Sequence, residues 1–290
     1  MPELPEVETV RRGLQEFIVG REIKAVEHDT PKSFPNADAD VQRFLIGSKV
    51  KQVRRRAKVL LIDLSSEYTL VIHLKMTGQM VFRSSAAVFG AGHPNDSLVG
   101  ELPDKTTRVT FTFTDGSRLF FNDQRKFGWV KLMPIIEVPN IDFMKKVGPE
   151  PLEADFTDRQ FTERFHRRSK TSIKAALLDQ TVVAGVGNIY ADESLWGAKI
   201  HPKRLVASIT EREFKALYKE LRDVMNLAIE KGGSTDRNYV NAEGKKGSYI
   251  DFARVFRREG QPCPRCGTTI VKMRAAGRGT HICPKCQVIQ

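Results

Sequence analysis

The chain has 290 residues, 40% of them hydrophobic, which is enough to fill the cores of two globular domains. Its 47 Lys and Arg residues outnumber 35 Asp and Glu residues, giving a formal net charge of +12 that favours a polyanionic partner such as nucleic acid. A basic chain also fits a ribosomal or membrane-surface protein, but the strand-sized apolar runs and acidic start predict neither a membrane span nor a secretory leader.

The first ten residues, MPELPEVETV, predict the start of an amphipathic helix. Pro5 and Glu6 suit a first helical turn, and the apolar residues that follow share one face. A helix start does not account for Pro2 and Glu3. If Met1 is removed, Pro2 offers a secondary amine with a pKa near ~8, so that roughly a tenth of it is an unprotonated nucleophile at neutral pH. An ordinary helix start and an N-terminal nucleophile both remain open on these residues alone.

A series of short β-branched or aromatic-rich segments predicts a β-sandwich or barrel-like N-terminal domain over residues 1–134. The expected strands are 22–29, 49–56, 59–64, 69–74, 107–114, 117–122 and 129–133. Residues 84–105 are rich in glycine and proline and predict a long surface loop. Residues 135–150 lack periodicity and predict a linker.

Helical spacing dominates the second half of the chain, and we expect a helical domain over residues 151–256. The expected helices are 157–165, 170–180, 190–196 and 211–231. Residues 232–247 are polar and punctuated by glycine, which predicts a mobile loop within this domain. Residues 257–290 form a separate cysteine-containing tail, so the predicted fold class is α+β.

All four cysteines lie in this tail, as two CxxC pairs separated by sixteen residues: Cys263, Cys266, Cys283 and Cys286. Each pair directs two thiolates toward one point, and two pairs complete a tetrahedral Zn²⁺ site with no open position. We therefore expect one structural zinc ion and a reducing compartment, the cytoplasm or nucleoid. The alternative, two metal-free knuckles, would leave a tail too small to bury a core.

A predicted β-hairpin between the cysteine pairs carries Arg278, flanked by Gly277 and Gly279. Glycines there allow the backbone to approach a phosphate, although a solvated arginine is the simpler interpretation. The stretch LDQTVVAGVGNIYADE predicts a helix that begins at or just after Asn188, where free backbone N–H groups suit an anion such as a DNA phosphate. A capped helical hairpin explains this stretch equally well.

Three segments of the first domain combine basic and apolar residues at strand ends. RRRAK places Lys58 before an apolar strand, HLKMTG places Met76 at a turn, and DQRKFG places Arg125 and Phe127 two residues apart on a shared face. A basic residue beside an apolar wedge suits a protein that fills the space left by an extruded base. Met76 and Phe127 as ordinary core residues remain the alternative.

Taken together, these segments resemble the formamidopyrimidine-DNA glycosylases, bacterial base-excision enzymes that remove oxidised purines. PELPEVE, RRAK, HLxMxG, QRKFG, LLDQxxVAGVGNIYADE, GRGTHxCPxCQ and the cysteine spacing occur in the family's order along nearly the whole chain. The PELPE start separates this branch from the similar endonuclease VIII-like enzymes. The resemblance implies a two-sheet β domain with flanking helices, a helix-two-turn-helix domain, a zinc-finger hairpin and a monomeric enzyme that binds damaged double-stranded DNA.

The resemblance also assigns the catalytic residues. Pro2, freed of Met1, attacks the sugar carbon that bears the damaged base and forms a Schiff base, and Glu3 transfers the proton that opens the sugar ring. Lys58 corresponds to the donor in β-elimination, and Arg278 corresponds to the donor in δ-elimination. Because arginine scarcely deprotonates, we interpret Arg278 as a phosphate clamp and electrostatic stabiliser.

Further residues correspond to DNA contacts or supporting groups: Glu6, Met76, Arg125, Phe127, Lys170 and Asn188. Met76, Arg125 and Phe127 match the residues that fill the vacated space, with Arg125 facing the cytosine opposite the lesion. The 232–247 loop matches the lid over the flipped base, with amides around 237–240 as candidates to contact the lesion.

Two features depart from the family pattern. The 84–105 loop is longer than usual, and Lys105-Thr-Thr-Arg108 stands where histidines are common, so a DNA contact is either lost or taken over by Thr106 or Arg108. Two rival functions remain: a catalytically silent nucleic-acid-binding zinc protein, and a glycosylase directed at oxidised pyrimidines.

Overall fold

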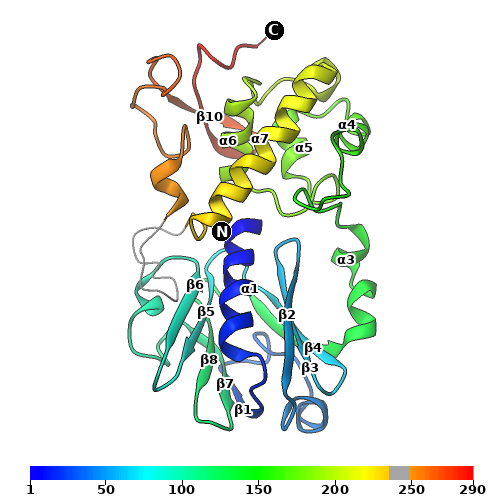
Figure 1. The fold of residues 1–290 in the computed structure, drawn as a ribbon, viewed down its shortest axis with the longest axis vertical. Coiled ribbons are helices and arrows are strands. Elements are labelled where there is room, and N and C mark those ends of the chain that lie inside the picture. Colours follow the sequence, from blue (N-terminus) through cyan, green and yellow to red (C-terminus); the bar gives the residue numbers. More distant parts are fainter. Residues whose placement is uncertain (235–247, 290) are drawn as a thin grey trace. The chain divides into compact units, whose positions relative to one another are not determined.

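The computed structural model describes residues 1–234 and 248–289. These residues form two compact units (Figure 1). The first unit comprises Met1–Lys145 and the described part of Lys231–Ser248, and the second comprises Lys146–Glu230 and the described residues from Tyr249 onward. Across the described ranges, none of the helices combines the length and the apolar character that crossing a membrane requires.

The first unit contains two antiparallel sheets (Figure 1). The five-stranded sheet has the order β1 (Ile23–His28), β7 (Thr107–Phe113), β8 (Arg118–Asp123), β5 (Gly78–Arg83) and β6 (Val88–Gly92). The four-stranded sheet has the order β2 (Val50–Arg56), β3 (Val59–Leu64), β4 (Tyr68–His73) and β9 (Trp129–Pro134). All seven predicted strands are present, and each predicted end lies within one residue of the observed end.

Helix α1 (Leu4–Ile18) packs against both sheets, as Figure 1 shows. Its predicted apolar face is buried, and Phe17 stacks on Phe82 and Phe89 with ring centroids 5.7 Å and 5.6 Å away. A Cβ atom at Gly13 would lie 2.1 Å from the Phe89 ring. The helix therefore approaches β6 so closely that position 13 has room only for glycine.

The prediction that residues 84–105 form a plain surface loop is wrong. They contain the edge strand β6 and a short 3₁₀ helix, η2 (Asp96–Leu98). Phe89 and Ala91 of β6 are buried, but Gly90 and Gly92 between and after them lack the side chains that reveal an alternating strand pattern. Strand β5 was also not predicted, because its first five residues are all buried and show no alternation.

Further short helices occur where the sequence has no clear helical period. They are α2 (Asp38–Asp40), the π-helical turn η1 (Val41–Leu45), the 3₁₀ helix η3 (Ile135–Asn140) and α3 (Asp142–Lys146). The last two lie in the segment predicted as a linker. Each is too short for a periodic apolar face to stand out in the sequence.

The second unit is helical, with a small β-hairpin. Its elements are α4 (Asp158–His166), α5 (Ile173–Leu178), α6 (Asn188–Gly197), η4 (Val206–Ser208), α7 (Glu211–Glu230), η5 (Tyr249–Phe252), β10 (Val271–Ala275) and β11 (Arg278–Ile282). Helix α7 packs against α6 and α4. Helix α5 is shorter than the predicted 170–180, because Ser172 caps its first turn by accepting a hydrogen bond from the Ala175 N–H. The two units together confirm the predicted α+β class.

Most of the predicted loop 232–247 lies outside the described residues. Only its first three residues, 232–234, fall within them. The amides around 237–240, predicted to contact the lesion, lie in the part that is not described.

Candidate active site and zinc centre

The candidate nucleophile lies at the start of α1. Pro2 and Glu3 are both buried, and Glu3 is only 3% exposed. The Glu6 carboxylate accepts hydrogen bonds from the Glu3 N–H at 2.7 Å and from the Ser234 N–H at 2.7 Å. Glu6 therefore fixes the backbone immediately after Pro2 and joins it to the start of the 232–247 segment.

An arginine connects this helix to the turn that carries Lys58. Arg55, on β2, donates from Nε to the Glu8 carboxylate of α1 at 3.2 Å and from a terminal nitrogen to the Ala57 carbonyl at 2.9 Å. Lys58 follows Ala57 and is 7% exposed. Although burial raises the pKa of Glu8, hydrogen bonds from Arg11 and Arg12 hold it below its usual value, so this anchor stays charged.

His73, which we did not single out in the sequence, lies beside the same turn. It ends β4 directly opposite Val59, the residue after Lys58. Burial lowers the pKa of His73 to about 3, with smaller contributions from the charges of Lys75 and Lys58. The neutral ring accepts from the Lys75 N–H through Nδ1 at 3.1 Å, which places its proton on Nε2. The only sequence signal that could have drawn attention to His73 was its position in HLKMTG.

A buried aspartate joins the two turns that carry Met76, Arg125 and Phe127. Asp123 is fully buried at the end of β8. One carboxylate oxygen accepts from the Thr77 hydroxyl and from the Arg125 N–H at 3.2 Å, and the other accepts from the Gly128 N–H at 2.6 Å. The Thr77 hydroxyl oxygen also accepts from the Arg125 N–H at 3.0 Å. Asp123 therefore fixes one turn against the other.

The side chains that these turns carry point outward. Phe127 is 49% exposed, so the interpretation of Phe127 as a core residue is wrong. The Arg125 guanidinium lies 4.7 Å from the centre of the Phe127 ring, which confirms that the two side chains share a face. Met76 is half-buried at the neighbouring turn. The first unit thus presents a cation and an exposed aromatic ring on one fixed support.

Left-handed backbone marks the candidate positions in both units. Seven non-glycine residues in the described ranges have positive φ, and four of these are Ala57, Lys75, Lys126 and Ala276, with φ of 51°, 50°, 56° and 50°. They lie within two residues of the candidates Lys58, Met76, Phe127 and Arg278. Such backbone costs free energy for residues other than glycine, and it clusters at functional sites.

Thr106 and Arg108 are buried and bonded within the first unit. Thr106 interacts with Asp104 and Ser97. Arg108 donates to the Asp123 carbonyl at 2.8 Å, the Asp29 carboxylate at 2.7 Å and the Lys105 carbonyl at 2.8 Å. Neither residue offers an exposed side-chain donor, so the structure does not support either of them as a replacement DNA contact.

The second unit brings Asn188 and the Arg278 hairpin together. Asn188 begins α6, as predicted, and its side-chain amide donates to the Gly279 carbonyl at 3.0 Å. Arg278 begins β11 and is exposed. Lys170 is exposed two residues before Ser172, the cap of α5. The helix N-terminus and the hairpin tip are thus directly bonded to each other.

The four cysteines form a structural zinc site. Their sulfur atoms all lie within 4.8 Å of one another, and Cys266 Sγ lies 3.5 Å from both Cys283 Sγ and Cys286 Sγ. Tetrahedral Zn–S bonds of about 2.3 Å place sulfur atoms roughly 3.8 Å apart, so the cluster fits zinc. Trp196 of α6 packs into the same small core, and the Arg265 guanidinium lies 4.0 Å from its ring centre.

A buried carboxylate ties the segment just before the cysteine-containing tail to α6. Glu193 accepts from the Val255 N–H at 2.9 Å, the Phe256 N–H at 2.8 Å and the Tyr249 hydroxyl at 3.1 Å. Burial and the neighbouring Glu193 charge hold the pKa of Tyr249 well above its usual value, so the phenol remains a donor.

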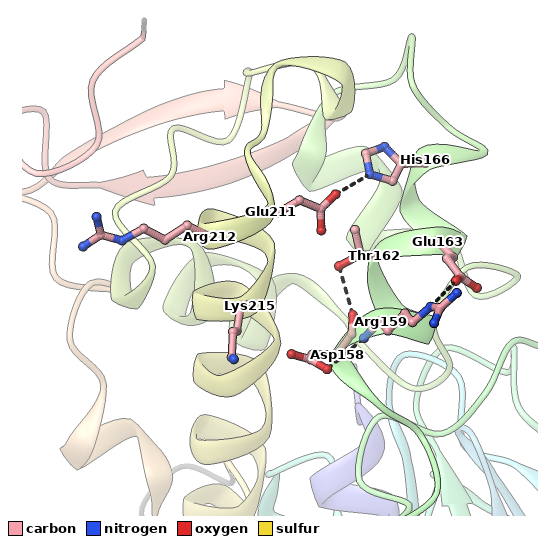
Figure 2. Close-up of a pocket in the computed structure, with 8 residues that line it drawn as sticks. All are labelled: Asp158, Arg159, Thr162, Glu163, His166, Glu211, Arg212 and Lys215. Carbon is pink, nitrogen blue, oxygen red and sulfur yellow. Dashed lines mark hydrogen bonds and ion pairs between the residues drawn. The ribbon is translucent and has the colours of Figure 1, made fainter.

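A separate pocket lies between α4 and α7 and is shown in Figure 2. Its volume is about 530 Å³, and its lining includes three acidic and three basic side chains that balance in charge. His166 and Glu211 pair across it at 3.3 Å (Figure 2). None of the candidate residues lines this pocket, so we do not connect it with the site.

Comparison with known proteins identifies the family. Three family models match the chain in order: the formamidopyrimidine-DNA glycosylase N-terminal domain over 1–130, its H2TH domain over 147–239, and a zinc finger found in FPG and IleRS over 260–288. The formamidopyrimidine-DNA glycosylase of Pelotomaculum thermopropionicum is 41% identical to this chain, over 100% of both sequences. That of Streptococcus pyogenes serotype M6 is 43% identical, over 99% of this chain and 98% of its own length.

Solved structures agree with these relatives. Lactococcus lactis Fpg in complex with abasic-site DNA is 36% identical, with a TM-score of 0.86 over 98% of this chain and 99% of that one. A point mutant of the same enzyme in complex with Fapy-dG DNA gives the same identity and TM-score over 99% of both chains. This chain therefore belongs to the formamidopyrimidine-DNA glycosylase family.

Proposed function

We propose that this chain is a bifunctional glycosylase and lyase that flips oxidised purines out of duplex DNA and excises them in base excision repair. Its substrates would be 8-oxoguanine and formamidopyrimidines, and it would then cut the strand by β,δ-elimination. The observation that carries the proposal is the buried Pro2-Glu3 pair just before α1, with its backbone fixed by Glu6. The net charge of +12 suits a DNA substrate at the nucleoid, bound by a monomer.

The chemistry begins with the Pro2 amine after Met1 is removed. Its nitrogen attacks the sugar C1′ as the bond from C1′ to the base breaks, so the base departs with the bonding electron pair and takes up the proton that the Pro2 nitrogen releases. Glu3 then gives a proton to the ring oxygen O4′, the C1′–O4′ bond breaks, and the Schiff base forms. An α-amine with a pKa near ~8 is partly unprotonated at neutral pH, whereas an ordinary lysine near ~10.4 is almost fully charged. This difference supports Pro2 as the nucleophile.

Strand cleavage would follow from the Schiff base. Loss of a proton from C2′ breaks the C3′–O bond and expels the 3′ phosphate, with Lys58 donating a proton to the departing phosphate oxygen. Loss of a proton from C4′ then breaks the C5′–O bond and expels the 5′ phosphate. Arg278 would hold the departing phosphate by charge and paired N–H groups. Lys170 and Asn188 would contact the DNA backbone.

Met76, Arg125 and Phe127 would fill the space that the flipped base leaves. An exposed aromatic ring beside a guanidinium supports this role, because the ring replaces lost stacking while the guanidinium donates to the orphaned base. Arginine donates only, so it pairs best with the acceptors of cytosine.

Borohydride trapping tests the proposal. We expect a covalent adduct, mapped to Pro2 by mass spectrometry, when the protein is mixed with a duplex carrying 8-oxoguanine opposite cytosine. Pro2→Leu, which retains Met1, should lose trapping and excision with zinc content unchanged. Pro31→Leu, at an exposed proline of the same unit, is the matched control and should trap normally. Excision by Pro2→Leu would refute the N-terminal nucleophile.

The same experiment separates the rival functions. A silent binding protein would retain the duplex without an adduct, and its binding would weaken steeply with salt. A panel of duplexes with 8-oxoguanine, formamidopyrimidine and oxidised pyrimidine separates the substrate classes. The pyrimidine belongs in the panel because the Lactococcus lactis enzyme was also solved with oxidised-pyrimidine DNA.

A further inference from the structure

A fully buried ion pair lies behind the Arg278 hairpin. Lys174 of α5 and Asp192 of α6 are both 0% exposed at their side chains, and Nζ lies 2.6 Å from the carboxylate. Lys174 also donates to the Thr280 hydroxyl of β11 at 2.6 Å. Because removing two charges from water is costly, a buried pair is a poor source of stability, and it is better understood as a device that fixes geometry.

The network fixes the residues immediately after Arg278. The Asp192 carboxylate accepts from the His281 N–H at 2.9 Å, and Asn188 donates to the Gly279 carbonyl at 3.0 Å. The Thr280 hydroxyl, held by Lys174, in turn donates to the Arg278 carbonyl at 3.1 Å. The backbone of Arg278 is therefore tied to two helices, while its side chain is exposed.

The hairpin needs this support because of its geometry. The tip before Arg278 is left-handed at both Ala276 and Gly277, and glycines stand on either side of the arginine. Glycines leave the backbone free to move, so an unsupported guanidinium would be spread over many positions. A phosphate clamp depends on the guanidinium being held where charge develops.

We propose that Lys174, Asp192 and Thr280 form a positioning clamp that sets the place of Arg278 and thereby the rate of the second strand cleavage. The three residues act through Arg278 and do not themselves touch the DNA. This inference depends on the role assigned to Arg278 under the proposed function.

Thr280→Val tests the clamp without leaving a buried charge unpaired, because the Lys174–Asp192 pair persists. Thr280→Ser restores the hydroxyl. The matched control is Thr162→Val, a buried threonine of the same unit whose hydroxyl donates to the Asp158 carbonyl at 2.9 Å (Figure 2). The substrate is a duplex with a preformed abasic site, which bypasses base excision, and gels separate the β product from the δ product.

We expect Thr280→Val to slow the δ step about tenfold relative to the β step, while borohydride trapping and zinc content stay at wild-type levels. Thr280→Ser and Thr162→Val should keep the wild-type product ratio. In an Arg278→Ala background, Thr280→Val should have no further effect on that ratio, because the clamp acts only through the arginine.

The outcomes separate the clamp from the role of Arg278. A δ step that is lost in Arg278→Ala but normal in Thr280→Val overturns the clamp alone. A normal δ step in Arg278→Ala overturns the assigned role of the arginine, and the clamp with it. Equal slowing of both eliminations by Thr280→Val, or slowing that persists without Arg278, would reduce Thr280 to a general structural residue.

Discussion

Replacing Asp123 by asparagine should destabilise the two turns that carry Met76, Arg125 and Phe127. The carboxylate accepts three hydrogen bonds in a fully buried position. Asparagine has one acceptor oxygen, so if that oxygen serves Thr77 and Arg125, the amide nitrogen faces the Gly128 N–H. The loss of one charge-assisted hydrogen bond, worth about 1.5–3 kcal/mol, and the donor left unpaired predict a local destabilisation of about 3 kcal/mol.

The effect on recognition follows from Arg125. Its backbone N–H is one of the three donors, so the guanidinium loses a fixed origin when Asp123 changes. A well-placed arginine contact to a base discriminates by about 1–3 kcal/mol, and we expect the preference for cytosine over adenine opposite the lesion to fall about tenfold.

Two assays check these expectations. Urea-dependent hydrogen exchange, read by mass spectrometry on peptides of β8 and β9, measures the local opening free energy without assuming that both units unfold together. Single-turnover excision opposite each base measures the preference. Asp115→Asn is the control, because Asp115 also accepts two hydrogen bonds at a turn, from Ser117, but is 47% exposed at its side chain, where it also pairs with Arg21. Because an exposed ion pair is worth at most about 1 kcal/mol, this variant should change stability by less than that.

Either of two results would refute this reasoning. Unchanged exchange in Asp123→Asn would mean that the turns are held by other contacts. Loss of protection with an unchanged base preference would mean that the position of Arg125 does not depend on this carboxylate.

Three further predictions concern other parts of the molecule. Gly13→Ala should lower the melting temperature, because a Cβ atom 2.1 Å from the Phe89 ring is a severe overlap that costs about 3 kcal/mol, against a gain of roughly 1 kcal/mol in helix propensity. The His73 ring should not titrate between pH 5 and 8 in NMR spectra assigned with His73→Gln, because burial lowers its pKa to about 3. The contribution of His73 to the free energy of unfolding is therefore complete above about pH 6.5, the pKa of histidine in the unfolded chain. It falls by roughly 1.4 kcal/mol per pH unit as the pH drops toward 3. Native mass spectrometry should find one zinc ion per chain and none in Cys283→Ser, with hairpin protection lost in that variant and the protection of β3 and β4 unchanged.

Local sequence signals predicted much of this structure. The strand 59–64 was predicted with the bounds of β3, since its apolar run is short and ends at turn residues. The start of α6 at Asn188 followed from a tight glycine turn, and the zinc site followed from cysteine spacing. In each case the residues that determine the feature lie within one short segment of the chain.

The edge strand β6 had no such local signal. Its conformation depends on contacts with distant residues: Phe89 packs against the helix at Gly13, and a side chain at Gly92 would collide with Gly78 and Gln79 of β5. From the sequence alone, the glycines of β6 indicate a loop. The close approach of another element, which favours glycine just as strongly, becomes visible only in three dimensions.

The same limit applies to the residues that support the site. Short motifs drew attention to Arg125 and Arg278, and the resemblance of those motifs to a known family assigned their roles. Asp123 and Lys174 do their work through partners 46 and 106 positions away, Thr77 and Thr280. A lysine between apolar helix residues is expected to reach solvent, yet Lys174 is fully buried. The sequence therefore identifies the groups that would meet DNA, whereas the buried groups that hold them in place are defined by the tertiary fold.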